Sequence, residues 1–494
     1  MPALSATARF VRRRCLALAL AAGMAGLAGC SATRPVYNQP LQARAAAETA
    51  EGGYRLSNLP ANARNSNELL VVASFSGGGA RAAALAYAVL DAMRQVPIDL
   101  GDGRGPHSLF DELDVISAVS GGSWPAAYLA QHGDAMFPAF EQQVLRRDLQ
   151  GDFVSELLAP AQWGWLFSPT YGRGDLFAEF LDREVFHGAT YADVLARRQR
   201  PWVTLNATDM SLGARFEFKQ EQFDLMCSDL GSVKLATAVA ASSAVPIALS
   251  PITLRNYAGH CPQPPALDLY GLFGERRRAQ YYQQAASYQD GKARPYIHLL
   301  DGGLADNLAI RAELEATMAA GGLRAVMEQS GIHGVRWLVC IVVNAEGHAG
   351  LEADRSDAVP SVLRVTQAVA DIPLGRHSND SLELLREAVA RWPQEAAGPN
   401  ADPNAPPPLK TYLIEVSLEA LEASSGESVG SSPLAGLSNS LSLRALPTAL
   451  SLPPAAVDQV LDAGHTLFRQ SPELKRLQLD LAAAVPAAPA VPRP

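Results

Sequence analysis

The chain has few cysteines and little concentrated charge, and it has no second long apolar run. Five cysteines in 494 residues form no C-x-x-C pair, so we predict no zinc site. No extended basic block follows the first fourteen residues and the formal net charge is −9, which argues against nucleic acid as a partner. Beyond the N-terminal segment no stretch reaches 18 apolar residues, so no further membrane span is expected. With 48% hydrophobic and 18% charged residues, the composition is that of a globular protein.

The N-terminus has the pattern of an export signal. Four arginines between residues 9 and 14 precede a run of small apolar residues from Cys15 to Ala28, too short to span a bilayer but typical of a secretory signal. The run ends in Leu27-Ala28-Gly29-Cys30, which looks like a bacterial lipobox. We therefore predict a signal peptide over 1–29 and a lipid on Cys30; the alternative is an ordinary signal peptide with a chance cysteine. By resemblance to Gram-negative lipoproteins, Ser31 after this cysteine favours a lipid anchor in the cell envelope, at the outer membrane of a Gram-negative bacterium.

Three further segments are expected in the mature chain. Residues 30–66 hold scattered prolines and polar residues and are interpreted as a tether. Residues 67–483 are predicted to form one catalytic domain with helical insertions, and residues 484–494, rich in Pro and Ala, a disordered tail. The proline-rich stretch from Trp392 to Leu409 is interpreted as a loop, and Val457–Leu481 as one or two helices split near Pro472.

Short apolar runs alternate with helix-forming segments along this domain. The strands are predicted at Glu68–Phe75, Leu113–Val119, Trp202–Ala207, Tyr296–Leu300, Trp337–Asn344 and Thr411–Val416. Such alternation indicates an α/β fold, and continuous apolar strands indicate a mostly parallel sheet covered by helices on both faces.

Two of the strands end in glycine-rich turns that lead into a helix. Ser76-Gly77-Gly78-Gly79-Ala80-Arg81 follows the first strand, and its backbone N–H groups can converge on an anion such as a phosphate or an oxyanion. Ala118-Val119-Ser120-Gly121-Gly122 is one residue away from G-x-S-x-G, the turn that exposes a nucleophilic serine. Each turn alone could be an ordinary tight turn.

A third strand ends in Leu300-Asp301-Gly302-Gly303. A carboxylate at a strand end can accept the proton of a serine hydroxyl and return it to a leaving group, although Asp-Gly is more often a plain turn. In an open α/β sheet ligands bind beyond the carboxyl ends of the strands, so the coincidence of three such turns predicts one site.

Together these motifs resemble the patatin-like phospholipase family, from about Glu68 to Arg476. Tyr171–Asp175, Asn206–Asp209, Ala240–Pro246 and Asp306-Asn307 are also similar to family segments. The resemblance implies a three-layer α/β/α sandwich with a central, mostly parallel sheet. It also implies hydrolysis of lipid acyl esters by a Ser–Asp dyad.

The resemblance assigns roles to single residues. Ser120 stands at the nucleophile and Asp301 at the catalytic aspartate, with Gly77, Gly78 and Gly79 as the oxyanion hole. Arg81 stands where the related cytosolic phospholipases have an arginine, and facing a substrate phosphate is one reading of it; a solvated helix residue is the other. No cofactor or metal is called for, and the expected partner is a membrane lipid or another acyl ester.

Two alternatives remain at this point. A Ser–His–Asp esterase would need a histidine after Asp301, and the candidates by position are His333, His348, His377 and His465. A non-catalytic envelope lipoprotein with the same fold is the other. Export also permits a disulfide between Cys227 and Cys261, against two free thiols. The lipid, its cleavage position and the oligomeric state stay open.

Overall fold

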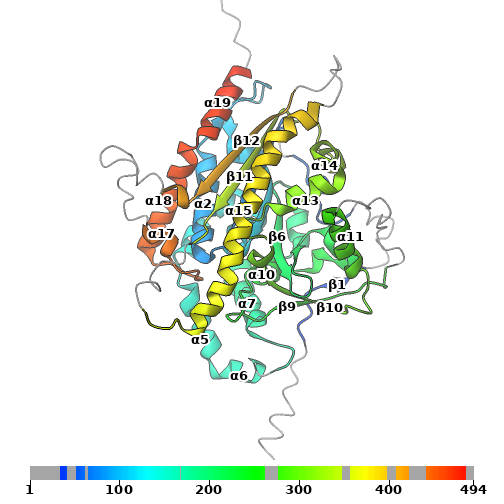
Figure 1. The fold of residues 1–494 in the computed structure, drawn as a ribbon, viewed down its shortest axis with the longest axis vertical. Helices are drawn as coiled ribbons and strands as arrows, with labels where there is room; N and C mark the ends of the chain where they lie inside the picture. The colour runs from blue at the N-terminus through cyan, green and yellow to red at the C-terminus, as the bar shows by residue number, and fades with distance from the viewer. Residues whose placement is uncertain are drawn as a thin grey trace, which may run out of the picture.

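The centre of the molecule is an eight-stranded sheet (Figure 1). The computed structural model describes residues 34–41, 52–61, 65–166, 168–261, 276–347, 357–397, 408–421 and 441–484. The strand order is β12-β11-β2-β5-β6-β10-β9, with β7 paired to β6. Strands β12, β11, β2, β5 and β6 are parallel, whereas β10 pairs antiparallel with both β6 and β9. The predicted mostly parallel sheet is therefore confirmed.

The six predicted strands are all present, and two of them have the predicted bounds. The sheet strands are β2 (Leu69–Phe75), β5 (Leu113–Val119), β6 (Trp202–Asp209), β7 (Ala214–Glu217), β9 (Ile252–Arg255), β10 (Tyr296–Asp301), β11 (Trp337–Asn344) and β12 (Lys410–Ser417). Two-residue strands outside this sheet are β1 (Gln39–Pro40), β3 (Pro97–Ile98), β4 (His107–Ser108) and β8 (Ser228–Asp229). Strands β7 and β9, which were not predicted from the sequence, extend the sheet beside β6 and β10.

Helices connect the strands and cover the sheet. They are α2 (Gly79–Arg94), α3 (Ser123–His132), α4 (Met136–Phe140), α5 (Leu149–Leu158), α6 (Pro160–Leu166), α7 (Arg173–Leu181), α8 (Tyr191–Ala196), α9 (Gln220–Leu225), α10 (Leu235–Ser242), α11 (Arg276–Tyr288), α12 (Gly303–Asp306), α13 (Arg311–Ala320), α14 (Leu323–Gln329), α15 (Val362–Ala397), α17 (Leu441–Ala445), α18 (Pro454–Gln470) and α19 (Pro472–Ala484). Among the described helices, none is both long enough and apolar enough to cross a membrane.

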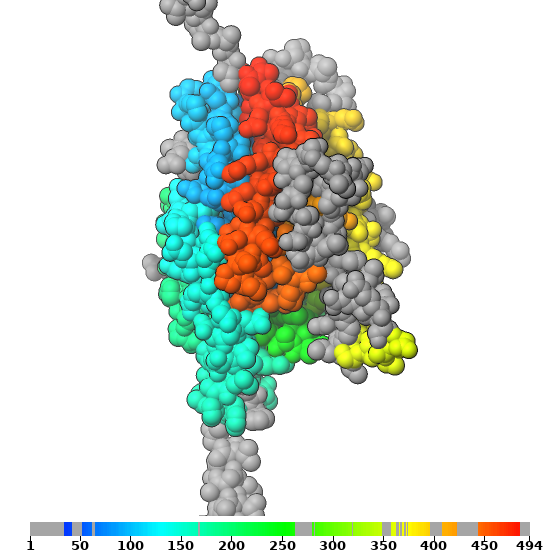
Figure 2. Space-filling model, turned by 90° about the vertical axis from the view of Figure 1, so that its left-hand side faces the viewer, coloured from blue at the N-terminus to red at the C-terminus, as the bar shows by residue number. Residues whose placement is uncertain are grey.

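The two faces of the sheet bury separate cores, because successive strand residues point in opposite directions. On β2, Val71 and Ala73 lie in the core beneath α2 and α18, whereas Leu70 belongs to a second core formed with α13, α14 and α15. In Figure 2 the orange-red surface of α18 lies beside the blue surface of α2, against which α18 packs. The resulting three layers confirm the predicted α/β/α sandwich.

Of two further predicted boundaries, one needs correction and one is confirmed. The loop predicted from Trp392 is wrong at its start, since α15 continues to Ala397 and Trp392 packs in the second core at 3% exposure. The split of the last helical segment near Pro472 is confirmed by α18 and α19.

The predicted tether is partly built into the fold. Residues 39–40 form β1, which pairs with β8, and the Asn38 side chain donates to the Arg255 carbonyl at 2.8 Å. Tyr54 is 1% exposed, and its hydroxyl accepts from the N–H of Val203. The predicted signal peptide, Cys30 and residues 485–494 lie outside the described residues.

Candidate active site

Ser120 occupies a strained turn at the carboxyl end of β5. The strand ends at Val119, and a 3-10 turn from Ser120 to Gly122 leads directly into α3. Ser120 has a φ of 51°, in the left-handed region that residues other than glycine rarely adopt. Such strain persists where the surrounding structure enforces it, and it is concentrated at functional sites. The predicted strand–turn–helix context of this serine is therefore present.

Glycines allow the two turns to touch. A Cβ on Gly121 would lie 2.0 Å from the carbonyl oxygen of Gly79, and one on Gly122 would lie 2.7 Å from that of Ser76. A Cβ on Gly77 would lie 3.3 Å from the Cβ of Ser120. The glycine-rich turn after β2 thus packs backbone to backbone against the serine turn.

Asp301 reaches the same point from the antiparallel strand β10. The hydroxyl of Ser120 donates to Oδ2 of Asp301 at 2.7 Å, although the two residues are 181 positions apart. The N–H of Gly303 donates to the other carboxylate oxygen at 2.8 Å. The aspartate's own backbone is fixed as well, because its N–H donates to the Ala244 carbonyl and its carbonyl accepts from the Thr208 hydroxyl.

The environment of Asp301 favours its protonated form. Burial raises the pKa of Asp301 to about 6, although the hydrogen bonds from Ser120 and Gly303 act to lower it. Among the described residues no cation is bonded to this carboxylate. Ser120 and Asp301 are only 5% and 8% exposed, so the pair lies in a nearly closed, low-dielectric site.

The three glycines of the first turn do not play equal parts. The N–H of Gly77 donates to the Asn307 carbonyl at 2.9 Å, which leaves it unavailable to a substrate and contradicts its predicted place in the oxyanion hole. Gly78 and Gly79 have φ of 135° and 62°, and within the described ranges neither N–H has a hydrogen-bond acceptor. Both stand at the start of α2, where the helix dipole favours negative charge.

Arg81 does not face an open cavity. Its side chain is buried, with the residue 2% exposed, and it donates to the backbone carbonyls of Ala345 and Leu446. Burial lowers the pKa of Arg81 to about 10. Both readings of this residue, the contact with a substrate phosphate and the solvated helix residue, are thus replaced by a structural one. The guanidinium ties the segments after β11 and α17 to the glycine-rich turn.

Further polar residues hold the serine turn, and no individual role was predicted for them. The N–H of Ser120 donates to the Ser242 hydroxyl at 2.8 Å, which in turn donates to the Asn206 carbonyl at 2.6 Å. The indole N–H of Trp124 donates to the Ser243 hydroxyl. Serines after a helix resemble any helix end in sequence, and only the segment similarity at Ala240–Pro246 could have drawn attention to them.

The candidate histidines are not brought to the site where the structure describes them. His333 and His377 are exposed, and Nε2 of His465 lies 3.2 Å from Oδ2 of Asp91 on α2. His348 is outside the described residues. Among the described residues no histidine ring is bonded to Ser120 or Asp301, and no cluster of metal-ligating side chains is found.

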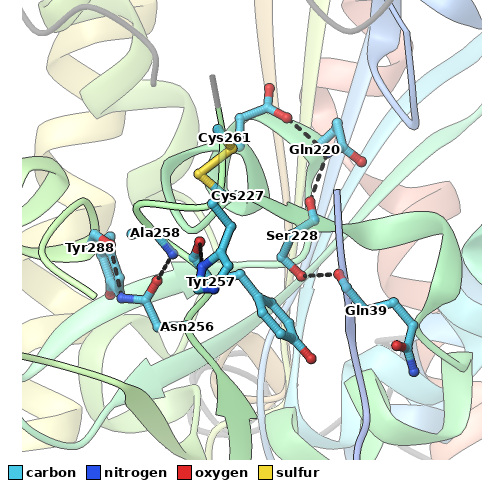
Figure 3. The surroundings of a disulfide bond; sticks show 11 residues. Gln39, Gln220, Cys227, Ser228, Asn256, Tyr257, Ala258, Cys261 and Tyr288 are labelled. Atoms are coloured by element: carbon cyan, nitrogen blue, oxygen red, sulfur yellow. Dashed lines mark hydrogen bonds between the residues drawn. A yellow bond between two sulfur atoms is a disulfide. The ribbon is translucent and has the colours of Figure 1, made fainter. Parts of the chain in front are cut away.

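Cys227 and Cys261 form a disulfide, as shown in Figure 3. Their Cα atoms are 5.5 Å apart, and the bond links the end of α9 to the segment after β9. Beside it, Ser228 donates to the Gln39 carbonyl, so the disulfide lies where the N-terminal strand joins the domain. Cys340 is a buried free thiol within β11.

Comparison with known proteins agrees with the family suggested by the motifs. Residues 73–314 match the family model described as patatin-like phospholipase. No curated protein matches the chain. Human GIVD cytosolic phospholipase A2 is similar in structure at 15% identity and a TM-score of 0.47, covering 92% of this chain and 69% of that chain. The same human protein in complex with methyl gamma-linolenyl fluorophosphonate is similar at 14% identity and a TM-score of 0.39, covering 94% of this chain and 64% of that one.

Proposed function

Residues 73–314 form a patatin-like phospholipase domain, and on this premise we propose that the protein hydrolyses acyl esters of membrane lipids with Ser120 as nucleophile and Asp301 as base. The observation that carries the proposal is the 2.7 Å hydrogen bond from the Ser120 hydroxyl to a buried carboxylate that no cation contacts within the described part of the chain. A hydroxyl so placed can lose its proton to the carboxylate as it attacks.

The first half of the reaction forms an acyl-enzyme. Oγ of Ser120 bonds to the ester carbonyl carbon while its proton moves to Oδ2 of Asp301. The negative charge that develops on the carbonyl oxygen is stabilised by the N–H groups of Gly78 and Gly79, and each such donor contributes about 2.7–4 kcal/mol. When the carbon–oxygen bond to the alcohol breaks, Asp301 returns the proton to the leaving oxygen.

The second half regenerates the enzyme. A water molecule replaces the alcohol and gives its proton to Asp301 as it attacks the acyl-serine ester. The proton then returns to Oγ of Ser120 as the fatty acid leaves. A base must be deprotonated at working pH yet hold a proton transiently, and a pKa of about 6 suits both tasks better than the ordinary value of an aspartate.

We further propose that the protein is lipid-anchored at Cys30 in the cell envelope, at the outer membrane. The lipobox-like sequence and the arginine-led apolar run support this, and so does the disulfide, because disulfides persist in oxidising compartments. Metabolic labelling with a fatty-acid analogue tests it. A label that disappears in Cys30→Ala supports the anchor, whereas an unlabelled parent chain contradicts it.

The nucleophile is tested by covalent labelling. An alkyl fluorophosphonate should label the parent chain on Ser120 and inactivate it toward a short-chain ester. Ser120→Ala should lose both label and activity, by at least about 10⁴-fold, because nucleophile removal takes away the whole covalent route. Ser74→Ala, which removes another buried hydroxyl on the neighbouring strand β2, is the matched control. Activity that survives Ser120→Ala would refute the assignment.

A further inference from the structure

A loop of exposed aliphatic residues begins beside the candidate active site. Ala244 is buried and accepts the hydrogen bond from the Asp301 backbone, yet the next residue, Val245, is 38% exposed and Ile247 is 57% exposed. Ile247 has φ of 73°, which is a genuine outlier for a β-branched residue. We call Val245 and Ile247 the apolar rim. A strained backbone that holds an apolar side chain in solvent next to a reactive site needs a functional explanation.

The apolar rim is connected to an exposed helical tip. Arg173, at the start of α7, donates to the Ile247 carbonyl at 2.7 Å. Two residues earlier, the Tyr171 ring packs against that of Trp165 on α6, with centroids 6.0 Å apart. The tip, formed by α5 and α6, exposes four large apolar side chains: Val154 at 43%, Leu158 at 66%, Trp163 at 55% and Trp165 at 51%.

A third exposed apolar region is a stripe along helix α15. Val365, Val369 and Ile372 are 50%, 69% and 58% exposed, and their spacing places them on one face of the helix. The same helix passes the active site, because a Cβ on Gly303 would lie 3.6 Å from Leu374. Figures 1 and 2 both place the N-terminal end of α15 and helices α5 and α6 at the lower end of the molecule.

The N-terminal segment points to what covers this end. Arg34, Val36 and Trp165 line one hollow of about 380 Å³, and Val36 is itself 56% exposed. Cys30 precedes Arg34 by four residues, which can span at most about 14 Å. A lipid chain on Cys30 would therefore enter a membrane close to Trp165.

The chemistry of the surface agrees with a lipid partner. Tryptophan favours the boundary between water and hydrocarbon, because its ring is apolar and its N–H is polar. The chain carries a net charge of −9, so attraction to anionic lipid cannot supply the binding and apolar insertion must.

We propose that this end of the molecule docks on a lipid bilayer, with the tip, the α15 stripe and the apolar rim inserted at the interface and the Ser120–Asp301 site facing the lipid. The role of this surface in catalysis rests on the proposed function, and its orientation toward the membrane rests on the proposed anchor at Cys30. The exposure of these side chains and their placement in the fold depend on neither proposal. Docking would give an acyl chain a short path from the bilayer to Ser120.

The test uses residues 31–494, which retain every described residue and lack the lipid attachment site, with vesicles of phosphatidylcholine and phosphatidylglycerol containing brominated lipid. The tip variant carries Trp163→Ser and Trp165→Ser, and the stripe variant carries Val369→Ser and Ile372→Ser. The matched control is Leu479→Ser, since Leu479 is 73% exposed on α19 at the opposite end (Figure 1). Thermal midpoints confirm that each variant is folded.

We expect the parent and the control to float with vesicles and the parent's tryptophan fluorescence to be quenched. Vesicle binding should fall at least tenfold in the tip variant and severalfold in the stripe variant. Hydrolysis of vesicle lipid should fall in parallel, while turnover of a soluble short-chain ester stays within twofold. Equal vesicle binding by the tip variant and the control, or no binding by the parent, would overturn the proposal.

Two other results separate the proposals from each other. If no ester is hydrolysed but vesicle binding still depends on Trp163 and Trp165, the docking surface stands and the proposed function fails. If the parent binds no vesicles and sediments as a dimer that the tip variant disrupts, this end is an interface between two copies of the chain, and bilayer docking is refuted.

Discussion

Two buried aspartates lie toward opposite ends of strand β5, and they differ in what surrounds them. Asp114, near the start of the strand, accepts from Arg200 at 2.6 Å, from the Asn65 amide and from the Val71 N–H. Asp301, beside the end of the strand, accepts from the Ser120 hydroxyl and the Gly303 N–H. Burial raises the pKa of each to about 6, so the pKa alone does not distinguish them.

The partners distinguish the two aspartates. A guanidinium and two fixed N–H donors occupy the oxygens of Asp114, and none of them gains from giving up its proton. In the proposed mechanism the Ser120 hydroxyl becomes a nucleophile when it gives up its proton, and among the residues that the structure describes no cation is bonded to Asp301. Under this proposal, what distinguishes a carboxylate that acts as a base from one that holds the fold together is the chemistry of its partner rather than its burial.

Among changes at the two aspartates, the largest expected effect is the loss of activity in Asp301→Asn. An amide cannot accept the Ser120 proton, and positioned proton transfer contributes about 10²–10⁴ to a rate, so kcat/KM on a soluble ester should fall by about 10²–10⁴. Asp114→Asn, corrected for folded fraction, should keep kcat/KM within threefold. A fall confined to Asp114→Asn would reverse the roles assigned to the two residues.

The next effect is on stability and falls on the other aspartate. Asp114→Asn leaves the Arg200 charge buried without its partner, and breaking a buried pair in this way typically costs about 3–5 kcal/mol. Urea unfolding should show a lower midpoint with an unchanged slope. An unchanged free energy of unfolding would mean that Arg200 finds water or another acceptor, and that Asp114 does not stabilise the fold.

The sequence could predict Asp301 but not Asp114. Asp301 stands at a strand end before two glycines. This local pattern can be recognised in the sequence, because the proposed chemistry needs a carboxylate at a strand end with small neighbours. Asp114 is one letter within the apolar run Leu113–Val119, and its partner Arg200 is 86 residues away, so only the fold brings them together. A structural ion pair places no local requirement on the chain and leaves no motif.

The other site residues also divide into those with a local motif and those whose contacts depend on distant parts of the chain. Ser120 and the glycines were predictable because close backbone contact restricts residue type, as at Gly121 against Gly79. The use of the Gly77 N–H depended on the position of Asn307, and the burial of Arg81 depended on the segment that reaches Leu446; both contacts are set by distant parts of the chain. The packing of Tyr54 into the domain could not be predicted for a similar reason. A single aromatic residue among polar neighbours does not produce the periodic apolar pattern that indicates a buried helix or strand.

A third prediction concerns the stability effect of Asp301→Asn, which should have the opposite sign to that of Asp114→Asn. The pKa of Asp301 is raised from 3.8 to about 6 in the folded state, so ionisation disfavours folding: the cost is absent below the unfolded pKa and complete above the folded one. Removing the charge should raise the free energy of unfolding at pH 8 by up to about 3 kcal/mol, and by much less at pH 4. Paired urea titrations at both pH values measure this, and a variant that is less stable at pH 8 would contradict it.

The smallest effect sharpens the identity of the base. If Asp301 must be ionised, kcat/KM on a soluble ester should be level from about pH 7 upward, about half as large at pH 6, and fall about tenfold for each pH unit well below that. Asp114→Asn should retain this limb, because Asp114 takes no part in the proton transfer, and the residual activity of Asp301→Asn should lack it. An imidazole titrates in the same pH range, but its ionisation depends strongly on temperature whereas that of a carboxyl does not. A limb that persists in Asp301→Asn and shifts on warming would therefore assign the base to a histidine, and the contrast between the two aspartates would lose its chemical meaning.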